Sequence, residues 1–238
     1  MENFPIQVIL FPLVAIAAVV FFFLRQKRAV AGYDQQFSNY RAGELAQRLG
    51  LGLVEGDPGF NLFIRHANVD VARGPSDKKP IHIGVKLAGQ RDGRDLMLRY
   101  LYRVEQETGF SSVTWRIWFD CRMSAAVSRP FPPFEVLSRK TPLGAIARTQ
   151  SLPEIPSGVA AVDAEYAICC SDPRMAALLA QMLPGFAHFA SAGVHLVGDG
   201  QQVAFVMQQD KAPLLASALY YAEDMARLLV ELSRRIGG

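Results

Sequence analysis

The feature that most constrains this chain is an uncharged run close to its N-terminus, at residues 6–24. As an α-helix this run would rise through roughly 28 Å, which is close to the hydrocarbon thickness of a bilayer. Gln7 is its only strongly polar side chain, so the polar face of an ordinary core helix is missing. A secretory signal needs cations before its apolar run, and only Glu2 is charged there. The run therefore predicts an uncleaved transmembrane helix rather than a buried helix or a signal peptide.

The charges beside this run predict its orientation. No Lys or Arg precedes it, whereas Arg25, Lys27 and Arg28 follow it directly. The positive-inside rule then places the rest of the chain in the cytoplasm and the N-terminus outside. We expect a single-pass protein of the inner (cytoplasmic) membrane, with these three cations touching lipid headgroups at the membrane surface. Three cysteines, an odd number without a C-x-x-C pair, agree with a reducing compartment.

Charge is distributed unevenly over the remaining chain. From Arg25 to Arg148 there are 20 Lys and Arg against 12 Asp and Glu, and from Thr149 onwards there are 5 against 9. Two interpretations of the basic half stay open, attraction to an anionic cytoplasmic leaflet or ordinary solvated surface. No nucleic-acid-binding motif accompanies the cations, so we expect no nucleic-acid partner.

Alternation of apolar and polar residues predicts a β-sheet in the middle of the chain. The alternation is clearest at residues 81–88 and 113–121, and a turn signal at 90–94 leads into a β-rich segment at 96–104. These three segments predict an antiparallel meander. Shorter strands are expected at residues 51–55, 61–71, 135–138, 166–170, 194–197 and 203–207.

Apolar residues at helical spacing predict three helices. The first covers residues 40–49, and the last covers residues 214–235. The second starts at Asp172, a good N-cap residue, and Pro173 fits the first helical position. The surface of the last helix carries two ion pairs at i, i+4 spacing, Glu223–Arg227 and Glu231–Arg235.

Together these elements predict an α+β fold, in which an N-terminal transmembrane helix is followed by an antiparallel-sheet domain with two packed C-terminal helices. The expected parts are a short N-terminal tail, the transmembrane helix, a juxtamembrane connector and one soluble α+β domain, at residues 1–5, 6–24, 25–37 and 38–238. Residues 140–160 contain three prolines, and a subdivision of the soluble domain would be expected there.

Two segments carry a family resemblance, residues 133–139 (PFEVLSR) and 163–179 (DAEYAICCSDPRMAALL). On these motifs and on the order of its elements, the chain resembles a diffuse group of bacterial single-span membrane-anchored proteins with an uncharacterised α+β soluble domain. The resemblance covers the layout of residues 40–236 and is specific only in the second segment. The chain departs from the group at Tyr166 and at the pair Cys169–Cys170. The resemblance implies fold and topology, and it supplies no catalytic residue.

No motif predicts a catalytic, cofactor-binding or metal-binding residue. The histidines are isolated in sequence, and a metal site built from Cys169 or Cys170 with His188 and His195 would have to assemble in three dimensions. A nucleophile elbow and a phosphate-binding loop are both missing from the sequence. We therefore predict no cofactor, and the sequence favours a non-enzymatic protein without deciding the point.

The segment at residues 113–121 carries a candidate partner contact. Trp115 and Trp118 fall on opposite faces of a regular strand, so one is expected in the core and the other outside it. We predict that Trp118 contacts a partner together with Arg116 and Arg122, because Trp and Arg are enriched at interface hot spots. The alternative is a second packed layer that covers this face.

The sequence thus predicts a non-enzymatic, membrane-anchored interaction domain, an accessory or assembly subunit of a larger membrane protein complex. Its expected partners are the lipid bilayer and integral membrane proteins, and the oligomeric state is left open. A membrane-tethered small-ligand or lipid-binding domain is the first alternative. An enzyme whose site is assembled from residues far apart in sequence is the second.

Overall fold

The computed structural model describes residues 21, 40–62, 82–108, 113–139, 152–186, 194–209 and 219–237. The chain divides into two compact units, Met1–Asn39 and Tyr40–Gly238. Except for Phe21, the predicted transmembrane helix at residues 6–24 lies outside the described residues, as do Arg25, Lys27 and Arg28. Among the described helices, none combines the length and the apolar character that crossing a membrane requires. The longest has 16 residues and carries charged side chains, so the predicted fold class is wrong where it begins with a transmembrane helix.

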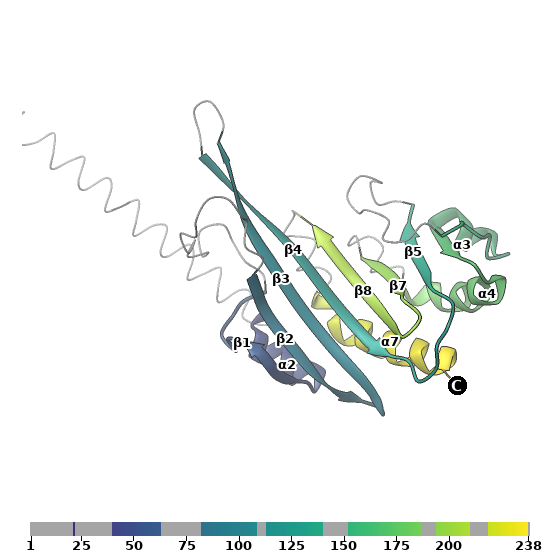
Figure 1. Cartoon of the computed structure of the whole chain (residues 1–238), viewed down its shortest axis with the longest axis horizontal. Helices are drawn as coiled ribbons and strands as arrows, with labels where there is room; N and C mark the ends of the chain where they lie inside the picture. The colour runs from purple at the N-terminus through teal and green to yellow at the C-terminus, as the bar shows by residue number, and fades with distance from the viewer. Residues whose placement is uncertain are drawn as a thin grey trace, which may run out of the picture. The chain divides into compact units, whose positions relative to one another are not determined.

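Eight strands of the unit Tyr40–Gly238 form one antiparallel sheet (Figure 1). In chain order they are β1 (Gly52–Gly56), β2 (His82–Arg91), β3 (Arg94–Thr108), β4 (Val113–Ala126), β5 (Phe134–Ser138), β6 (Tyr166–Cys170), β7 (His195–Gly198) and β8 (Gln202–Gln209). Their order across the sheet is β1-β2-β3-β4-β8-β7-β5-β6. The described helical segments are α2 (Ala42–Leu49), α3 (Ala160–Glu165), α4 (Pro173–Met182), η3 (Leu183–Phe186) and α7 (Ala222–Gly237).

The predicted meander is confirmed as β2-β3-β4. Its first turn is tight, because Asp92 and Gly93 both take positive φ, 51° and 75°, as a two-residue hairpin loop with right-handed strand twist requires. The late strands β7 and β8 pair with each other, and β8 also pairs with β4 along eight residues. One continuous sheet therefore joins the early and the late strands.

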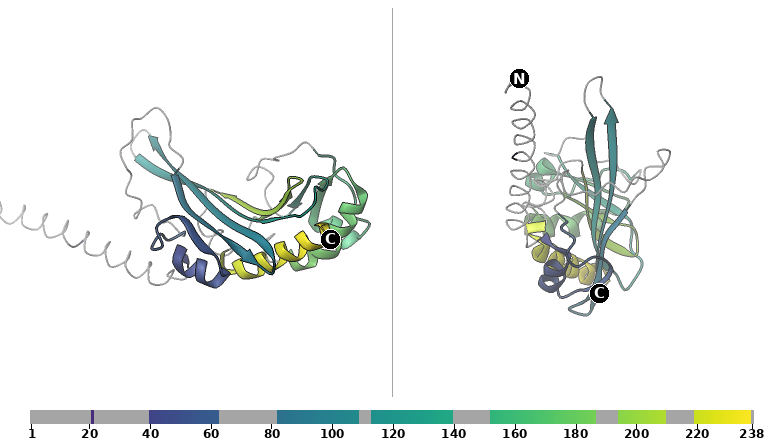
Figure 2. Two further views of the ribbon diagram at one scale, coloured as in Figure 1. Left: turned by 60° about the horizontal axis from the view of Figure 1, so that its bottom comes forward. Right: turned by 90° about the vertical axis from the view of Figure 1, so that its left-hand side faces the viewer.

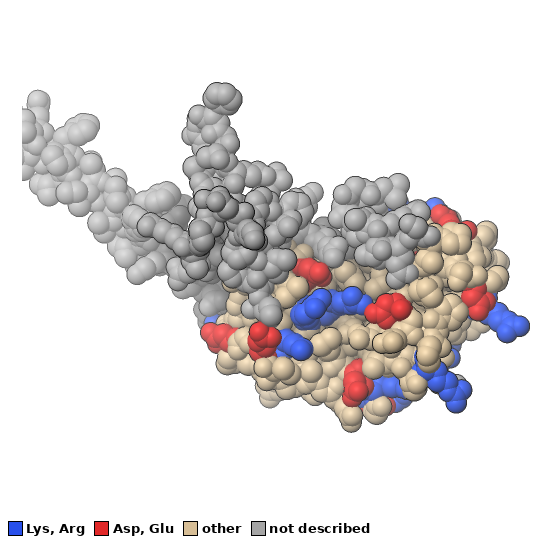
Figure 3. Space-filling view, viewed as in Figure 1, with Lys and Arg blue, Asp and Glu red and all other residues tan. Residues whose placement is uncertain are grey.

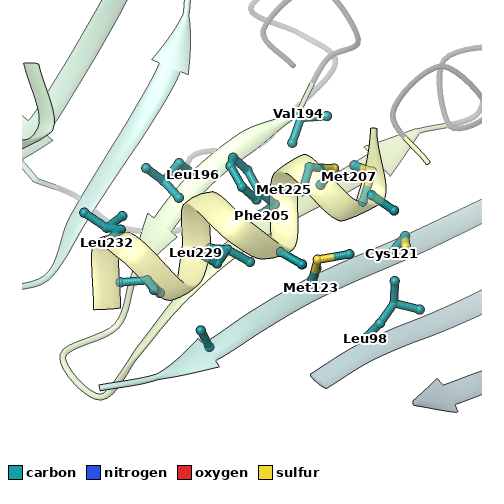
Figure 4. Packing of buried hydrophobic residues seen from close by; sticks show 14 of the residues in the cluster. Leu98, Cys121, Met123, Val194, Leu196, Phe205, Met207, Met225, Leu229 and Leu232 are labelled. Atoms are coloured by element: carbon teal, nitrogen blue, oxygen red, sulfur yellow. The ribbon is translucent and has the colours of Figure 1, made fainter. Parts of the chain in front are cut away.

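The main core lies between this sheet and the helices. Met225, Leu229 and Leu232 of α7 face Phe205 of β8 and Met123 of β4, and all five side chains are buried (Figure 4). The buried side chains of α2, α3 and α4 belong to the same cluster. Two C-terminal helices were predicted to pack on the sheet, and the structure adds α2 and α3 to them, since both bury apolar residues in this core.

Both edges of the sheet are protected against pairing with another chain. At the β6 edge, the amide of Ile155 donates to the carbonyl of Ile168 (2.9 Å) and the amide of Cys170 donates to the carbonyl of Pro153 (3.0 Å). At the other edge, β1 has only five residues, and its register with β2 shifts between Leu53 and Glu55. Short, bulged and charged edge strands are common ways of preventing aggregation.

The ion pairs of α7 agree only in part with the sequence prediction. Glu231 and Arg235 pair at 2.6 Å, as expected. Glu223 instead pairs with Arg48 of α2 at 3.0 Å, and Arg227 pairs with Asp224 at 2.6 Å. The predicted ion pair Glu223–Arg227 is therefore wrong, because α2 packs beside α7 and places Arg48 within reach of Glu223. The described part of α7 also begins at Ala222, eight residues after the predicted start, and residues 210–218 are not described.

The predicted N-cap of α4 is confirmed, since the Asp172 carboxylate accepts a hydrogen bond from the Arg174 amide at 2.8 Å. We expect Asp172→Ala to lower the free energy of unfolding by about 1 kcal/mol, the usual effect of losing such a cap. Chemical denaturation followed by circular dichroism measures it. Ser171→Ala, an exposed neighbour, should change stability by less than about 0.5 kcal/mol, and equal losses in both variants would refute the capping role.

Candidate ligand-binding face

The sheet has two faces of different character. We call the side on which α7 packs the helix face, and the other side the open face. The helices α2, α4 and α7 lie along the helix face of the sheet (Figure 2). Their buried apolar side chains belong to the main core. Because side chains alternate along a strand, the residues between core positions point to the open face. In β3, for example, Leu98 and Tyr100 are core residues, so Arg99 lies on the open face.

Three cations of the open face lie directly opposite one another on neighbouring strands. Lys86 of β2 pairs in register with Arg99 of β3, and Arg99 pairs with Arg122 of β4. We call Lys86, Arg99 and Arg122 the cationic row. All three are partly exposed. Figure 3, which looks onto the open face, shows Lys and Arg side chains gathered near its middle with acidic side chains around them.

Carboxylates stand at both ends of the cationic row. Glu55 of β1 is the register partner of Lys86. At the other end, Asp199 pairs with Arg122 through Oδ2 at 3.5 Å. The Asp199 Oδ1 atom accepts hydrogen bonds from the amides of Gln201 (3.0 Å) and Gln202 (2.8 Å), so the β7–β8 turn holds this carboxylate in place.

Arg99, at the centre of the row, differs from the other two groups in its surroundings. Both of its direct cross-strand neighbours are cations, an arrangement that destabilises a sheet. Asp120 lies diagonally across from it on the open face, yet no ion pair joins the two. Within the described part of the chain, Arg99 and Lys86 form no ion pair or side-chain hydrogen bond, whereas Arg122 is held by Asp199. In the described structure, Arg99 at the centre of the row is therefore not paired with a carboxylate.

Apolar side chains border the cationic row. Met97 and Leu101 precede and follow Arg99 on the same face of β3, and both are partly exposed. Further along the open face, a second apolar cluster is separate from the main core and buried; it consists of Val197, Ala204 and Val206. The accessible part of the open face thus combines positive charge with apolar surface.

Two buried polar residues lie on the far strands of the open face. Glu135 of β5 is 1% exposed and His195 of β7 is 4% exposed. Glu135 is the register partner of Val197, so it lies diagonally across from His195. Burial lowers the pKa of His195 to about 4, which keeps the imidazole neutral at pH 7.

The residues predicted as partner contacts have mixed outcomes. Arg122 belongs to the cationic row. Trp118 and Arg116 occupy alternate positions of the same strand, opposite Arg103 and Glu105, but their side chains lie outside the described part of the structure, so their contact role stays a prediction. Sequence reasoning missed Lys86 and Arg99, because only the strand register shows that they meet Arg122.

Among the described residues, no cluster of His, Cys, Asp or Glu could hold a metal ion, and His188 of the candidate metal site lies outside the described residues. Cys121, Cys169 and Cys170 are buried free thiols. Burial raises the pKa of the Cys121 thiol well above its usual range, with a smaller contribution from Asp120. A buried, protonated thiol of this kind serves as a small core residue.

Comparisons with known proteins give one likeness. No family model matches the chain, and no curated protein matches it. Among solved structures, the chain is similar to the mycobacterial trehalose monomycolate transport factor A, TtfA, with 11% sequence identity and a TM-score of 0.39. The likeness covers 79% of this chain and 94% of that chain. At this TM-score it carries no weight for the function of the open face.

Proposed function

We propose that the unit Tyr40–Gly238 is a lipid-binding domain, which acts by binding rather than by catalysis and holds an anionic amphiphile on its open face. The observation that carries the proposal is the setting of Arg99. This partly exposed guanidinium has cations on both sides across the strands, Met97 and Leu101 on both sides along its strand, and no ion pair. A charged group joined to an apolar chain complements such a surface.

The charge distribution supports a place of action. The half of the chain from Arg25 to Arg148 carries 20 Lys and Arg against 12 Asp and Glu, and the cationic row belongs to this half. The cytoplasmic leaflet presents anionic lipids, which attract basic surfaces that come close to it. We therefore propose that the domain meets its lipid at the cytoplasmic surface of the inner membrane.

A competition experiment tests lipid binding. The purified full-length chain in dodecyl maltoside is titrated into fluorescently labelled lysophosphatidic acid, and the anisotropy is followed. We expect saturable binding that unlabelled lysophosphatidic acid reverses, with a neutral monoacylglycerol of the same chain length competing about tenfold less well. If labelled lysophosphatidic acid shows no saturable binding, the proposed function is wrong.

A second candidate function, an accessory or assembly subunit, is favoured by one exposed site. Tyr220 is 64% exposed and packs edge-on against Tyr221, with ring centroids 5.0 Å apart. Its carbonyl accepts a hydrogen bond from Arg48 of α2 at 3.4 Å. Exposed Tyr and Arg side chains are typical of interface hot spots. Gentle extraction from native membranes followed by mass spectrometry tests this candidate: a fixed partner should co-migrate with the wild type and be lost from Tyr220→Ala.

A further inference from the structure

We propose that the cationic row is a site for a phosphate monoester headgroup, with Arg99 as its central ligand and Asp199 as a carboxylate that competes for Arg122. This inference rests on the proposed lipid-binding function and names the chemical class of its ligand. It also assigns three binding residues and one residue that sets affinity. Each step follows from the register and the contacts of β2, β3, β4 and the β7–β8 turn.

The spacing of the row fits one anionic group. Neighbouring strands lie about 4.7–4.9 Å apart, so the three Cα atoms span roughly 10 Å, and long side chains can converge on a point above Arg99. A phosphate monoester offers three oxygens and close to two negative charges at neutral pH. A guanidinium binds two of these oxygens in parallel, while a lysine adds a third contact as a point charge.

The charges around the row favour occupancy at its centre. The carboxylates at its ends are Glu55, opposite Lys86, and Asp199, paired with Arg122. Arg99 has neither an ion pair nor a side-chain hydrogen bond in the described structure. An anion above Arg99 would relieve the repulsion from both neighbouring cations, whereas the carboxylates at the ends of the row stand beside Lys86 and Arg122 and form no ion pair with Arg99.

Asp199 is placed to set the affinity. Its Oδ1 atom is held by the turn amides of Gln201 and Gln202, and only Oδ2 reaches Arg122, at the long distance of 3.5 Å. The side chains of Arg122 and Asp199 are 31% and 43% exposed, so the pair contributes little to stability and a headgroup can displace it. Replacing Asp199 by Asn keeps an oxygen for the turn amides and removes the competing charge.

The test measures lysophosphatidic acid binding by the full-length chain in dodecyl maltoside, for the wild type and three variants. We expect Arg99→Gln to weaken binding about tenfold or more, since a bidentate charge-assisted contact is lost. Asp199→Asn should strengthen binding about two- to fivefold, a gain that misfolding cannot produce. Arg174→Gln removes an exposed cation from α4, outside the row, and should leave the affinity unchanged.

The outcomes separate the two proposals. Saturable lysolipid binding that Arg99→Gln and Asp199→Asn leave unchanged would refute the cationic row as headgroup site while the lipid-binding function stands. Absence of lysolipid binding in the wild type refutes the function itself. Inorganic phosphate identifies the source of the ligand: if it displaces the lysolipid at equal concentration, the site binds free phosphate and the lipid assignment is wrong.

Discussion

Phe205→Ala is expected to lower the free energy of unfolding by about 3–5 kcal/mol, the usual loss for deleting a buried phenyl ring. Phe205 is 1% exposed and lies on β8 beneath α7, close to Met225 and Leu196 (Figure 4). β8 joins the early meander to the late strands, so a cavity at Phe205 loosens the contacts of α7 with both parts of the sheet. Urea denaturation of the full-length chain in neutral detergent, followed by circular dichroism, measures the loss.

Tyr220→Ala is the matched control for this prediction. Tyr220 is also aromatic but is 64% exposed, so its removal should change stability by less than about 0.5 kcal/mol. A loss below about 1 kcal/mol for Phe205→Ala, or an equal loss in both variants, would mean that α7 does not pack on β8 as described.

Acidification from pH 6.5 to pH 4 should lower the free energy of unfolding by about 3 kcal/mol through the protonation of His195 alone. Its pKa is lowered from 6.5 to about 4 in the folded protein, because burial disfavours the imidazolium. Well above pH 6.5 the imidazole is neutral in both states and has no effect on stability. As the pH falls, the unfolded chain takes up the proton first, so stability decreases until both states are protonated below pH 4.

The variant His195→Gln separates this effect from all other effects of acidification on stability. Unfolding free energies of both proteins are measured between pH 7 and pH 4. The difference between wild type and variant should change by about 3 kcal/mol over this range. If the unfolding free energies of wild type and variant change in parallel with pH, His195 takes up its proton equally well in the folded and the unfolded protein.

Several elements could be predicted from the sequence because local interactions decide them. The strand at β6 and the cap at Asp172 are confirmed. A β-rich segment favours a strand, and Asp followed by Pro favours the start of a helix, so neighbouring residues decide both elements. The meander is also confirmed, because period-two alternation and a short turn bring consecutive strands together. By contrast, the helix α3 was missed within a proline-rich stretch, since it has six residues and no side-chain cap.

Other expectations failed because the decisive contacts are distant in sequence. Glu223 was predicted to pair with Arg227 one turn away, but it pairs with Arg48, 175 residues away. The transmembrane helix that opened the predicted fold class is not among the described helices.

The sequence by itself determined the strands of the meander, the strand β6 and the start of α4, because these depend on residues two to four positions apart. Only the tertiary structure decided that β8 inserts beside β4, and that Lys86, Arg99 and Arg122 stand side by side. The physical reason is register: a shift of one residue between β2, β3 and β4 would move these cations to the helix face. The cationic row, and with it the proposed lipid site, exists only in the assembled sheet.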